Sequence, residues 1–349
     1  MAPIKQRAAI LTENGVTFGL ADVPKLGPGQ ILVRVVAAVQ NPVDLKSIGM
    51  VSKAGNYGGI LGNDFAGVVE ELGPDVPEGV RTVGERVAGL IKGLFQPNGT
   101  FSEYLVADAE RGVVPIPDSW SFEEAAQLGI AALTGLQTLH QSLGLPSPFD
   151  PKSGPPRDIL IWGGASSVGQ YAIQFAKLNG LRVLTTASPK NFDLVKDLGA
   201  DVVFDYRDEN VVEKIRAATG NVLDIAIDTI SEGRTTQQIP AAIGDKGGKV
   251  GIILPYESPR PDVTVTFSLA WDLLKPPLSL CRSSPSRNQM ASGTLICSGR
   301  SWPRRISSPT RSFIQPSGIA GVKDGLQYMS QGKVSAQKIT YRIADTPQL

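Results

Sequence analysis

The chain has 349 residues, enough for about two domains of ~150 residues each. Its hydrophobic fraction of 42% and charged fraction of 19% are those of an ordinary globular protein. The net charge of +1 gives no overall field for a nucleic acid or a membrane surface, and no run of about 18 apolar residues could span a bilayer.

The first 120 residues have the pattern of a small β domain. Residues 31–39, ILVRVVAAV, are β-branched and follow the turn LGPGQ, and further short apolar runs occupy residues 67–73, 84–90 and 101–108. Glycine, proline or asparagine flanks each run, which predicts a barrel-like domain over residues 1–120. The N-terminal sequence MAPIKQRAAILTENG lacks the apolar core of a signal peptide, so we expect a cytoplasmic location.

The pattern changes at Ser121, which forms a capping box with Glu124 and begins a long helical region. A proline-rich loop, residues 146–158, follows it. From residue 158 onward, near-continuous apolar strands alternate with amphipathic helices, which is typical of a parallel sheet covered on both faces. The sequence therefore predicts an α/β fold, with a doubly wound domain at residues 121–265 and a return to the first domain at 266–349.

The first strand–helix junction of this second domain reads DILIWGGASSVGQYAIQFAK, from Asp158 to Lys177. Glycines at this position permit a tight turn and close packing, and the helix N-terminus favours a pyrophosphate. Ser166 stands where the middle glycine of a dinucleotide fingerprint is expected, so a plain strand–helix corner stays open as an alternative. The candidate loop is Gly163, Gly164, Ala165, Ser166, Ser167, Val168 and Gly169.

The end of the second strand indicates which dinucleotide the domain prefers. NAD-specific sites commonly carry an acidic residue there for the ribose 2′-hydroxyl, whereas this strand ends TTASPKN. Ser188 and Lys190 are candidates to hold a 2′-phosphate, with Tyr206 closing over the same group. This pattern favours NADP(H); the alternative is that Lys190 is an ordinary solvated lysine.

Metal chemistry is not indicated by the rare residues. The chain contains one histidine, His140, and two cysteines, Cys281 and Cys297, with no pair at ligand spacing. Structural zinc usually takes four Cys or His ligands and catalytic zinc about three. We therefore expect no zinc, and we expect His140 to be a packing residue on its apolar helix.

The order of motifs resembles the medium-chain dehydrogenase/reductase superfamily, which joins a GroES-like β-barrel to a Rossmann domain. The supporting segments are NPVDLK, LGNDFAGVVEELG, VGERVAGL, GTFSEYLVAD, GGASSVG and GLQYMSQGKVSAQKITYRI. Zinc alcohol dehydrogenases of that superfamily carry Gly-His-Glu where this chain has Gly62, Asn63 and Asp64. The sequence thus resembles the zinc-free branch, and Asp64 is expected to be structural.

Within that branch the chain is most similar to the fungal trans-acting enoyl reductases of polyketide synthases, on the segments SPKNFDLVKDLGADVVFDYRDEN and FSLAWDLL. The resemblance implies NADP contacts from the glycine loop and from Val43, Asp44, Leu45, Lys46, Ser188, Pro189, Lys190, Asn191, Tyr206, Ile253, Leu254, Val334 and Ser335. It implies substrate contacts from Gly129, Ile130, Ala131, Ala132, Leu133, Thr134, Gly135 and Leu136. It also implies a polyketide synthase as partner and a monomer or homodimer as the oligomeric state.

Reduction of a conjugated double bond needs no metal, because hydrogen-bond donors stabilise the enolate charge that develops on the thioester carbonyl. A proton must also reach the α-carbon. Tyr57 and Lys46 are the candidate catalytic residues; the alternatives are a loop tyrosine and a lysine that neutralises cofactor phosphate. Two other functions stay open, namely a quinone or enone reductase with a free substrate and a non-catalytic NADP-binding partner of a synthase.

Residues 276–313 do not fit this pattern. The segment is dense in serine, arginine and proline, contains both cysteines, and lies in a stretch without acidic residues between Asp272 and Asp324. A basic linker or an RNA-contacting tract has such a composition. We favour a reading-frame or exon-boundary error in the deduced sequence.

Overall fold

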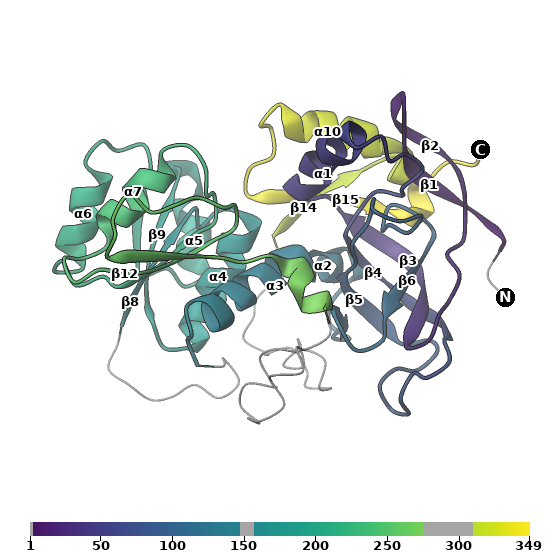
Figure 1. Ribbon diagram of the computed structural model, residues 1–349, viewed down its shortest axis with the longest axis horizontal. Coiled ribbons are helices and arrows are strands. Elements are labelled where there is room, and N and C mark those ends of the chain that lie inside the picture. Colours follow the sequence, from purple (N-terminus) through teal and green to yellow (C-terminus); the bar gives the residue numbers. More distant parts are fainter. Residues whose placement is uncertain (1–2, 147–156, 276–309) are drawn as a thin grey trace. The chain divides into compact units, whose positions relative to one another are not determined.

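The computed structural model describes residues 3–146, 157–275 and 310–349 (Figure 1). They form two compact units. Unit 1 consists of residues 3–130, 271–275 and 310–349, and unit 2 of residues 131–146 and 157–270. The chain passes into unit 2 after Ile130 and returns after Ala270, where the sequence had placed these limits at 120 and 265.

Unit 1 is the β domain that the sequence predicts. Among its described residues, a ribbon of β1 and β2 accompanies a sheet in the order β14-β15-β3-β4-β5-β7, and β6 also pairs with β3. The strands are β1 (Lys5–Thr12), β2 (Gly15–Asp22), β3 (Gln30–Val39), β4 (Asp64–Leu72), β5 (Arg86–Leu90), β6 (Tyr104–Asp108), β7 (Val113–Pro115), β14 (Arg311–Gln315) and β15 (Gln337–Arg342). Strand β3 is central, since it pairs with β4, β6 and β15.

The register of unit 1 brings the ends of three strands together. Val39, the last residue of β3, pairs with Asp64 at the start of β4 and with Thr340 in β15. Polar residues that flank these positions in the sequence therefore meet at one end of the sheet. Beneath them, Phe101 packs edge-on against Tyr341, with ring centroids 5.0 Å apart and neither side chain exposed.

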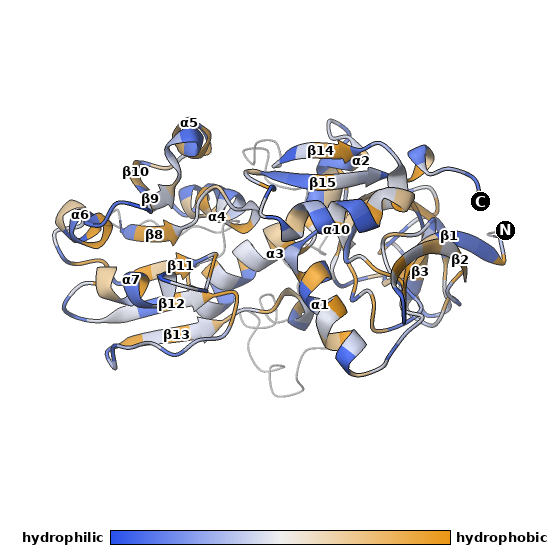
Figure 2. Cartoon of the chain, turned by 90° about the horizontal axis from the view of Figure 1, so that it is seen from above, coloured by the Kyte–Doolittle hydropathy of each residue, from blue (hydrophilic) through white to orange (hydrophobic). Residues whose placement is uncertain are grey.

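Unit 2 confirms the predicted alternation of strands and helices. Its sheet has the order β10-β9-β8-β11-β12-β13, and all five pairings are parallel. The strands are β8 (Asp158–Trp162), β9 (Arg182–Ala187), β10 (Val202–Asp205), β11 (Ile225–Asp228), β12 (Gly248–Ile252) and β13 (Val263–Phe267). Figure 2 shows them side by side in this order. In sequence order this is 3-2-1-4-5-6, so the strand order reverses between β8 and β11, where doubly wound sheets bind their ligands.

The helices that accompany these strands are α4 (Ser167–Leu178), α5 (Phe192–Asp197), α6 (Val211–Ala218) and α7 (Thr235–Ala242). Ile215 of α6 and Ile239 of α7 join Leu160 and Ala226 of the sheet in one fully buried apolar cluster. The carboxyl edge of the sheet is thus built on a rigid core.

Four features differ from the sequence prediction or extend it. Residues Pro42–Lys53 form helix α1, and the long helical region after Ser121 is broken at Gly129 into α2 (Phe122–Ala125) and α3 (Ile130–Gln137). Strand β13 was not predicted. The anomalous segment ends earlier than residue 313, because β14 begins at Arg311. Strand β14 pairs in parallel with β15, and helix α10 (Val322–Ser330) connects the two strands. Residues 276–309, with both cysteines, lie outside the described residues.

Candidate functional site

The glycine loop of unit 2 lies between β8 and α4, at the point where the strand order reverses. Gly163 has a left-handed φ of 82°, which supplies the tight turn. A Cβ on Gly169 would lie 2.3 Å from the carbonyl oxygen of Gly163, so only glycine allows this close approach. The first and last glycines of the motif therefore serve the roles that the fingerprint predicts.

Ser166 explains why the middle glycine can be absent. Its hydroxyl oxygen accepts from the Gly169 amide at 2.9 Å as the N-cap of α4, and the hydroxyl lies 2.8 Å from Oγ1 of Thr229 at the end of β11. The side chain is directed back into the loop and across to the next strand. Serine at this position therefore caps α4, and its hydroxyl bonds within the loop and to the next strand.

Three amides at the start of α4 define the chemistry of the loop. The N–H groups of Ala165, Ser167 and Val168 have no acceptor among the residues that the structure describes. Half-buried amides at the positive end of a helix form a site for an anion such as a pyrophosphate. The sequence-predicted loop thus has the donors that a dinucleotide requires.

The neighbouring strand ends hold the residues predicted to select NADP(H). Ala187 of β9 pairs with Asp205 of β10, so Ser188 and Tyr206 leave the sheet at the same level. The Ser188 hydroxyl accepts from the Asn191 side-chain amide at 3.2 Å, and Pro189 and Lys190 are exposed.

Arg207, which sequence reasoning missed, is a second cation near this edge. Its guanidinium lies 5.4 Å from the centroid of the Tyr206 ring, and the ring is 44% exposed. The same guanidinium pairs with Asp205 at 3.2 Å. Lys190 and Arg207 are two cations at this edge for a 2′-phosphate, and Asp205 offsets part of the charge of Arg207. A cation directly after the tyrosine was the signal that could have identified it.

Hydroxyl residues connect the remaining strand ends, and the sequence analysis did not single them out. The Thr186 hydroxyl accepts from the Gly163 amide at 3.0 Å, and the Ser231 hydroxyl accepts from the Ile253 amide at 2.9 Å. Ser231 adopts a left-handed φ of 56°. Ile253 and Leu254, both candidate cofactor contacts, are half-buried at this edge. The predicted cofactor residues of unit 2 therefore come to one edge of one sheet.

In unit 1 the segment NPVDLK begins helix α1 beside a buried polar cluster. Asn41, Asp44, Asn63, Asp64 and Lys338 make up this set, which we call the Asp64 cluster, and all five are at most 3% exposed. The Asn41 side-chain amide donates to Asp64 at 2.9 Å, and the Lys338 ammonium donates to Asn41 at 2.6 Å and to Asp64 at 3.3 Å. The sequence analysis named Asp44 as a cofactor contact and Asp64 as a structural residue, and it missed Lys338.

Asp44 is a predicted cofactor residue whose carboxylate is turned into the cluster. It accepts from the Asn41 backbone amide and from the Asn63 side-chain amide, each at 2.6 Å. Burial raises the pKa of Asp44 to about 7, against the lowering effect of these two hydrogen bonds. The nearby carboxylate of Asp64 raises it further, and the Lys338 ammonium lowers it.

The other candidates of α1 are not brought to one point. Val43 and Leu45 are half-buried and Lys46 is exposed, all in the first turn of the helix. Tyr57 is 41% exposed, and its hydroxyl donates to the carbonyl of Ser52 in the last turn at 3.4 Å. The two catalytic candidates are thus separated along α1: Tyr57 contacts Ser52, and the six residues from 46 to 52 rise about 9 Å along the helix. Val334 is half-buried and Ser335 exposed, ahead of β15.

The predicted substrate segment falls at Gly129 and in helix α3. A Cβ on Gly129 would lie 2.2 Å from Oδ1 of Asp64, and the Ile130 amide donates to that same oxygen at 2.7 Å. Further along, a Cβ on Gly135 would meet the Ala172 amide nitrogen of α4 at 3.4 Å. Residues 131–136 are all buried. Gly129 and Ile130, the first two residues of the segment, therefore make an internal contact with Asp64.

His140 is buried and its Nδ1 lies 3.2 Å from the carbonyl oxygen of Leu145. Burial lowers the pKa of His140 to about 4, so the ring is neutral at physiological pH. This environment is that of a packing residue, as the sequence analysis expects.

The donor set of unit 1 does not fit zinc. The side-chain oxygen of Asn63, at the position of the zinc-ligand histidine, accepts from the Trp271 indole N–H at 3.1 Å, and its amide nitrogen is committed to Asp44. Residues 3–146, 157–275 and 310–349 contain no group of three or more His, Cys, Asp or Glu side chains placed to hold a metal. Across the same residues, no helix has the length and apolar character to cross a membrane.

Comparison with known proteins gives the relationships of both units. Residues 27–118 match the alcohol dehydrogenase GroES-like domain, and residues 167–266 match the zinc-binding dehydrogenase family. A trans-enoyl reductase of Alternaria alternata is 37% identical over 346 residues, covering 97% of this chain and 99% of that protein. A trans-enoyl reductase of Pyricularia oryzae is 36% identical and covers 94% of each chain.

Among solved structures, the CurK enoyl reductase matches with a TM-score of 0.75 at 20% identity, over 97% of this chain and 99% of that one. The quinone oxidoreductase from Coxiella burnetii matches with a TM-score of 0.71 at 23% identity, over 97% and 99%. At these identities the structural likeness establishes the fold alone.

Proposed function

The chain belongs to the trans-enoyl reductases of the medium-chain dehydrogenase/reductase superfamily, and we propose that it uses NADPH to reduce an α,β-unsaturated acyl thioester carried by a polyketide synthase. The observation that carries the cofactor half of this proposal is the carboxyl edge of the unit 2 sheet. There, three amides without an acceptor among the described residues lie in the glycine loop, two strands from Tyr206 and Arg207. An anion-binding loop beside a cationic, tyrosine-bearing strand end suits a dinucleotide with an added 2′-phosphate.

The overall reaction consumes one proton and one hydride. Bound NADPH would supply the hydride for a new C–H bond at the β-carbon, and the π electrons of the double bond would move onto the thioester carbonyl as an enolate. A proton then adds to the α-carbon, giving the saturated acyl thioester and NADP⁺. The substrate is activated by its own carbonyl, which is consistent with a unit 1 donor set that does not fit zinc.

This chain's residues bind and orient the reactants. The α4 amides would hold the pyrophosphate of bound NADPH, and Ser188, Lys190, Tyr206 and Arg207 would hold its 2′-phosphate. In unit 1 the N-terminal part of α1 would face the nicotinamide half, with Lys46 as the cation assigned to cofactor charge. Tyr57 is the candidate donor of the proton to the α-carbon, and water is the alternative.

The direct test follows NADPH oxidation with a crotonyl thioester of pantetheine, with NADH and a free quinone as comparison reagents. We expect turnover with NADPH and the thioester. Turnover with the quinone alone would instead assign a free-standing quinone reductase. NADPH binding without turnover of any enoyl thioester would assign a non-catalytic partner of a synthase.

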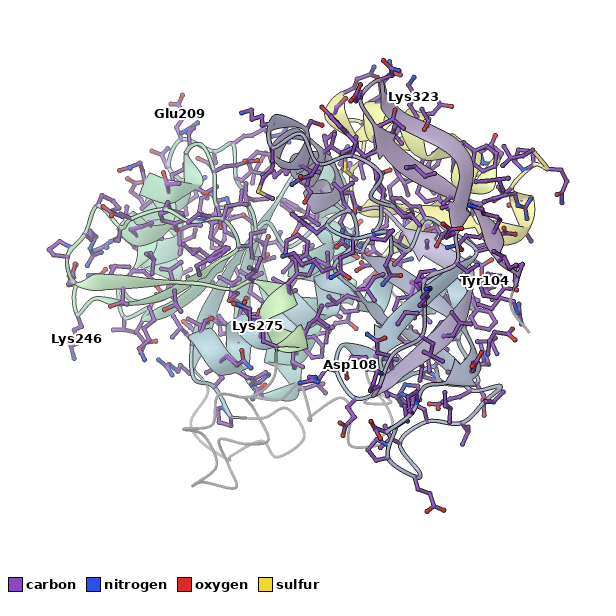
Figure 3. All side chains as sticks on the ribbon, turned by 45° about the vertical axis from the view of Figure 1, so that its right-hand side comes forward. Tyr104, Asp108, Glu209, Lys246, Lys275 and Lys323 are labelled. Atoms are coloured by element: carbon purple, nitrogen blue, oxygen red, sulfur yellow. The ribbon has the colours of Figure 1, made fainter. Side chains whose placement is uncertain are left out.

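The proton donor is tested in the same assay. Tyr57→Phe removes the hydroxyl and keeps the ring, so a donor role predicts a fall in kcat of about 10²-fold with an unchanged KM for NADPH. Wild-type kcat in this variant would assign the proton to water. Tyr104→Phe, a change in unit 1 on β6 (Figure 3), is the matched control.

A further inference from the structure

The Asp64 cluster is unusual because it buries a lysine and two carboxylates inside unit 1. Lys246 and Lys323 extend from the surface in Figure 3, as most lysines do, whereas Lys338 is 3% exposed. Its ammonium reaches Asp64, which is not exposed at all. A buried ion pair is costly to form, and its directional contacts can specify a geometry that apolar packing does not.

The contacts of the cluster join four parts of the chain, at Asn41, Asp64, Ile130 and Lys338. Asn41 bridges the pair, because its amide nitrogen donates to Asp64 and its oxygen accepts from Lys338. The second oxygen of Asp64 accepts from the Ile130 amide at 2.7 Å. Gly129 makes this approach sterically possible, since any Cβ there would overlap that oxygen.

Each of these contacts adjoins a segment with a proposed role. Asn41 precedes residues 43–46, Ile130 opens the substrate segment 129–136, and Lys338 follows residues 334–335. Ala336, which lies between Ser335 and Lys338, has a left-handed φ of 54°, a strained conformation that the surrounding contacts must hold. The buried ion pair and Asn41 therefore hold a unit 1 residue within or beside each of three segments that are expected to contact the nicotinamide or the acyl chain.

We propose that Asp64 and Lys338 are positioning residues for hydride transfer, which act through Asn41 and the Ile130 amide and do not touch the reactants. This inference rests on the proposed function. Misplacement of reacting groups by about 1 Å can cost 10²-fold in rate. Loss of the pair should therefore lower kcat, whereas NADPH affinity should change little because the phosphate contacts lie in unit 2.

The test measures turnover per NADPH-binding site, with sites counted by fluorescence titration of NADPH. Asp64→Asn and Lys338→Met should each lower this turnover about 10- to 100-fold with the dissociation constant of NADPH within about threefold. The double variant should lose no more than either single one, because both changes break the same contact. Lys338→Arg keeps the charge and should recover part of the rate, while Lys323→Met is the matched control in unit 1.

Each outcome decides the question. Wild-type turnover per site in Asp64→Asn and Lys338→Met overturns the inference. Losses that add in the double variant, or that Lys338→Arg does not reduce, assign the pair a purely structural role and also overturn it. Failure of the wild type to turn over any enoyl thioester refutes the proposed function instead, and the variants are then compared with whichever acceptor the wild type reduces.

Discussion

Replacement of Asp44 by asparagine should change how stability depends on pH. The folded protein raises the pKa of this carboxyl from 3.8 to about 7, so the fold favours the protonated form. Between these values the folded state binds more protons than the unfolded state, and stability therefore falls as the pH rises. The stabilising contribution is complete below pH 4 and is lost as the pH rises through about 7.

The size of the effect follows from the shift. About three pKa units at ~1.4 kcal/mol each give an upper limit of about 4 kcal/mol between pH 4 and pH 8. Asp44→Asn removes this pH-dependent contribution to stability. It also loses about one hydrogen bond, ~1 kcal/mol, at every pH, because a side-chain amide has one oxygen and cannot accept from Asn41 and Asn63 as the two carboxylate oxygens do. The variant should be slightly less stable than the wild type at pH 4 and more stable by up to ~3 kcal/mol at pH 8.

Urea unfolding followed by circular dichroism, at intervals from pH 4 to pH 8, measures this difference. Glu78→Gln replaces an exposed carboxylate of unit 1 and should give a curve parallel to the wild type. A difference between Asp44→Asn and wild type that stays constant over this range would refute the reasoning, because it would mean that Asp44 remains ionised in the fold.

Three further results are expected. Tyr206→Ala should raise the KM for NADPH far more than that for NADH, and equal effects would contradict the 2′-phosphate role. Gly169→Ala should weaken NADPH binding more than 10-fold in a fluorescence titration, because its Cβ would overlap the Gly163 carbonyl; unchanged binding would exclude the loop as the pyrophosphate site. His140→Asn should leave the pH dependence of kcat/KM between pH 5.5 and 7.5 unchanged, since burial keeps His140 neutral there, and loss of a step near 6.5 would show that it titrates.

The sequence was most informative about unit 2. Its strands are apolar runs of four to six residues, and glycines such as Gly180, Gly199 and Gly220 end the helices between them with left-handed φ values of 72°, 110° and 57°. These signals are local, so they predict the alternation of strands and helices, the parallel sheet and the glycine loop without knowledge of tertiary contacts. The polar β13 lacks an apolar run and was missed for the same reason.

The break at Gly129 and the Asp64 cluster were beyond such reasoning. Gly129 lies in an apolar helical pattern, and only the carboxylate of Asp64 packed against it requires the missing Cβ. Lys338 is separated from Asn41 by 297 positions and from Asp64 by 274. Pairing of β15 with β3 brings them together, and no property of residues 334–342 indicates a buried ammonium.

This contrast follows from the two kinds of site. In the proposed function backbone amides of unit 2 bind the phosphates, and the glycines that shape a backbone are visible in the sequence. The geometry of unit 1 is held instead by the charges of Asp64 in β4 and Lys338 in β15, which meet each other and Asn41, two residues after β3. Substitutions in the first kind of site should weaken cofactor binding, and those in the second should slow the chemical step while binding persists. The kinetic difference between Gly169→Ala and Asp64→Asn is therefore a measure of how the two units divide the reaction.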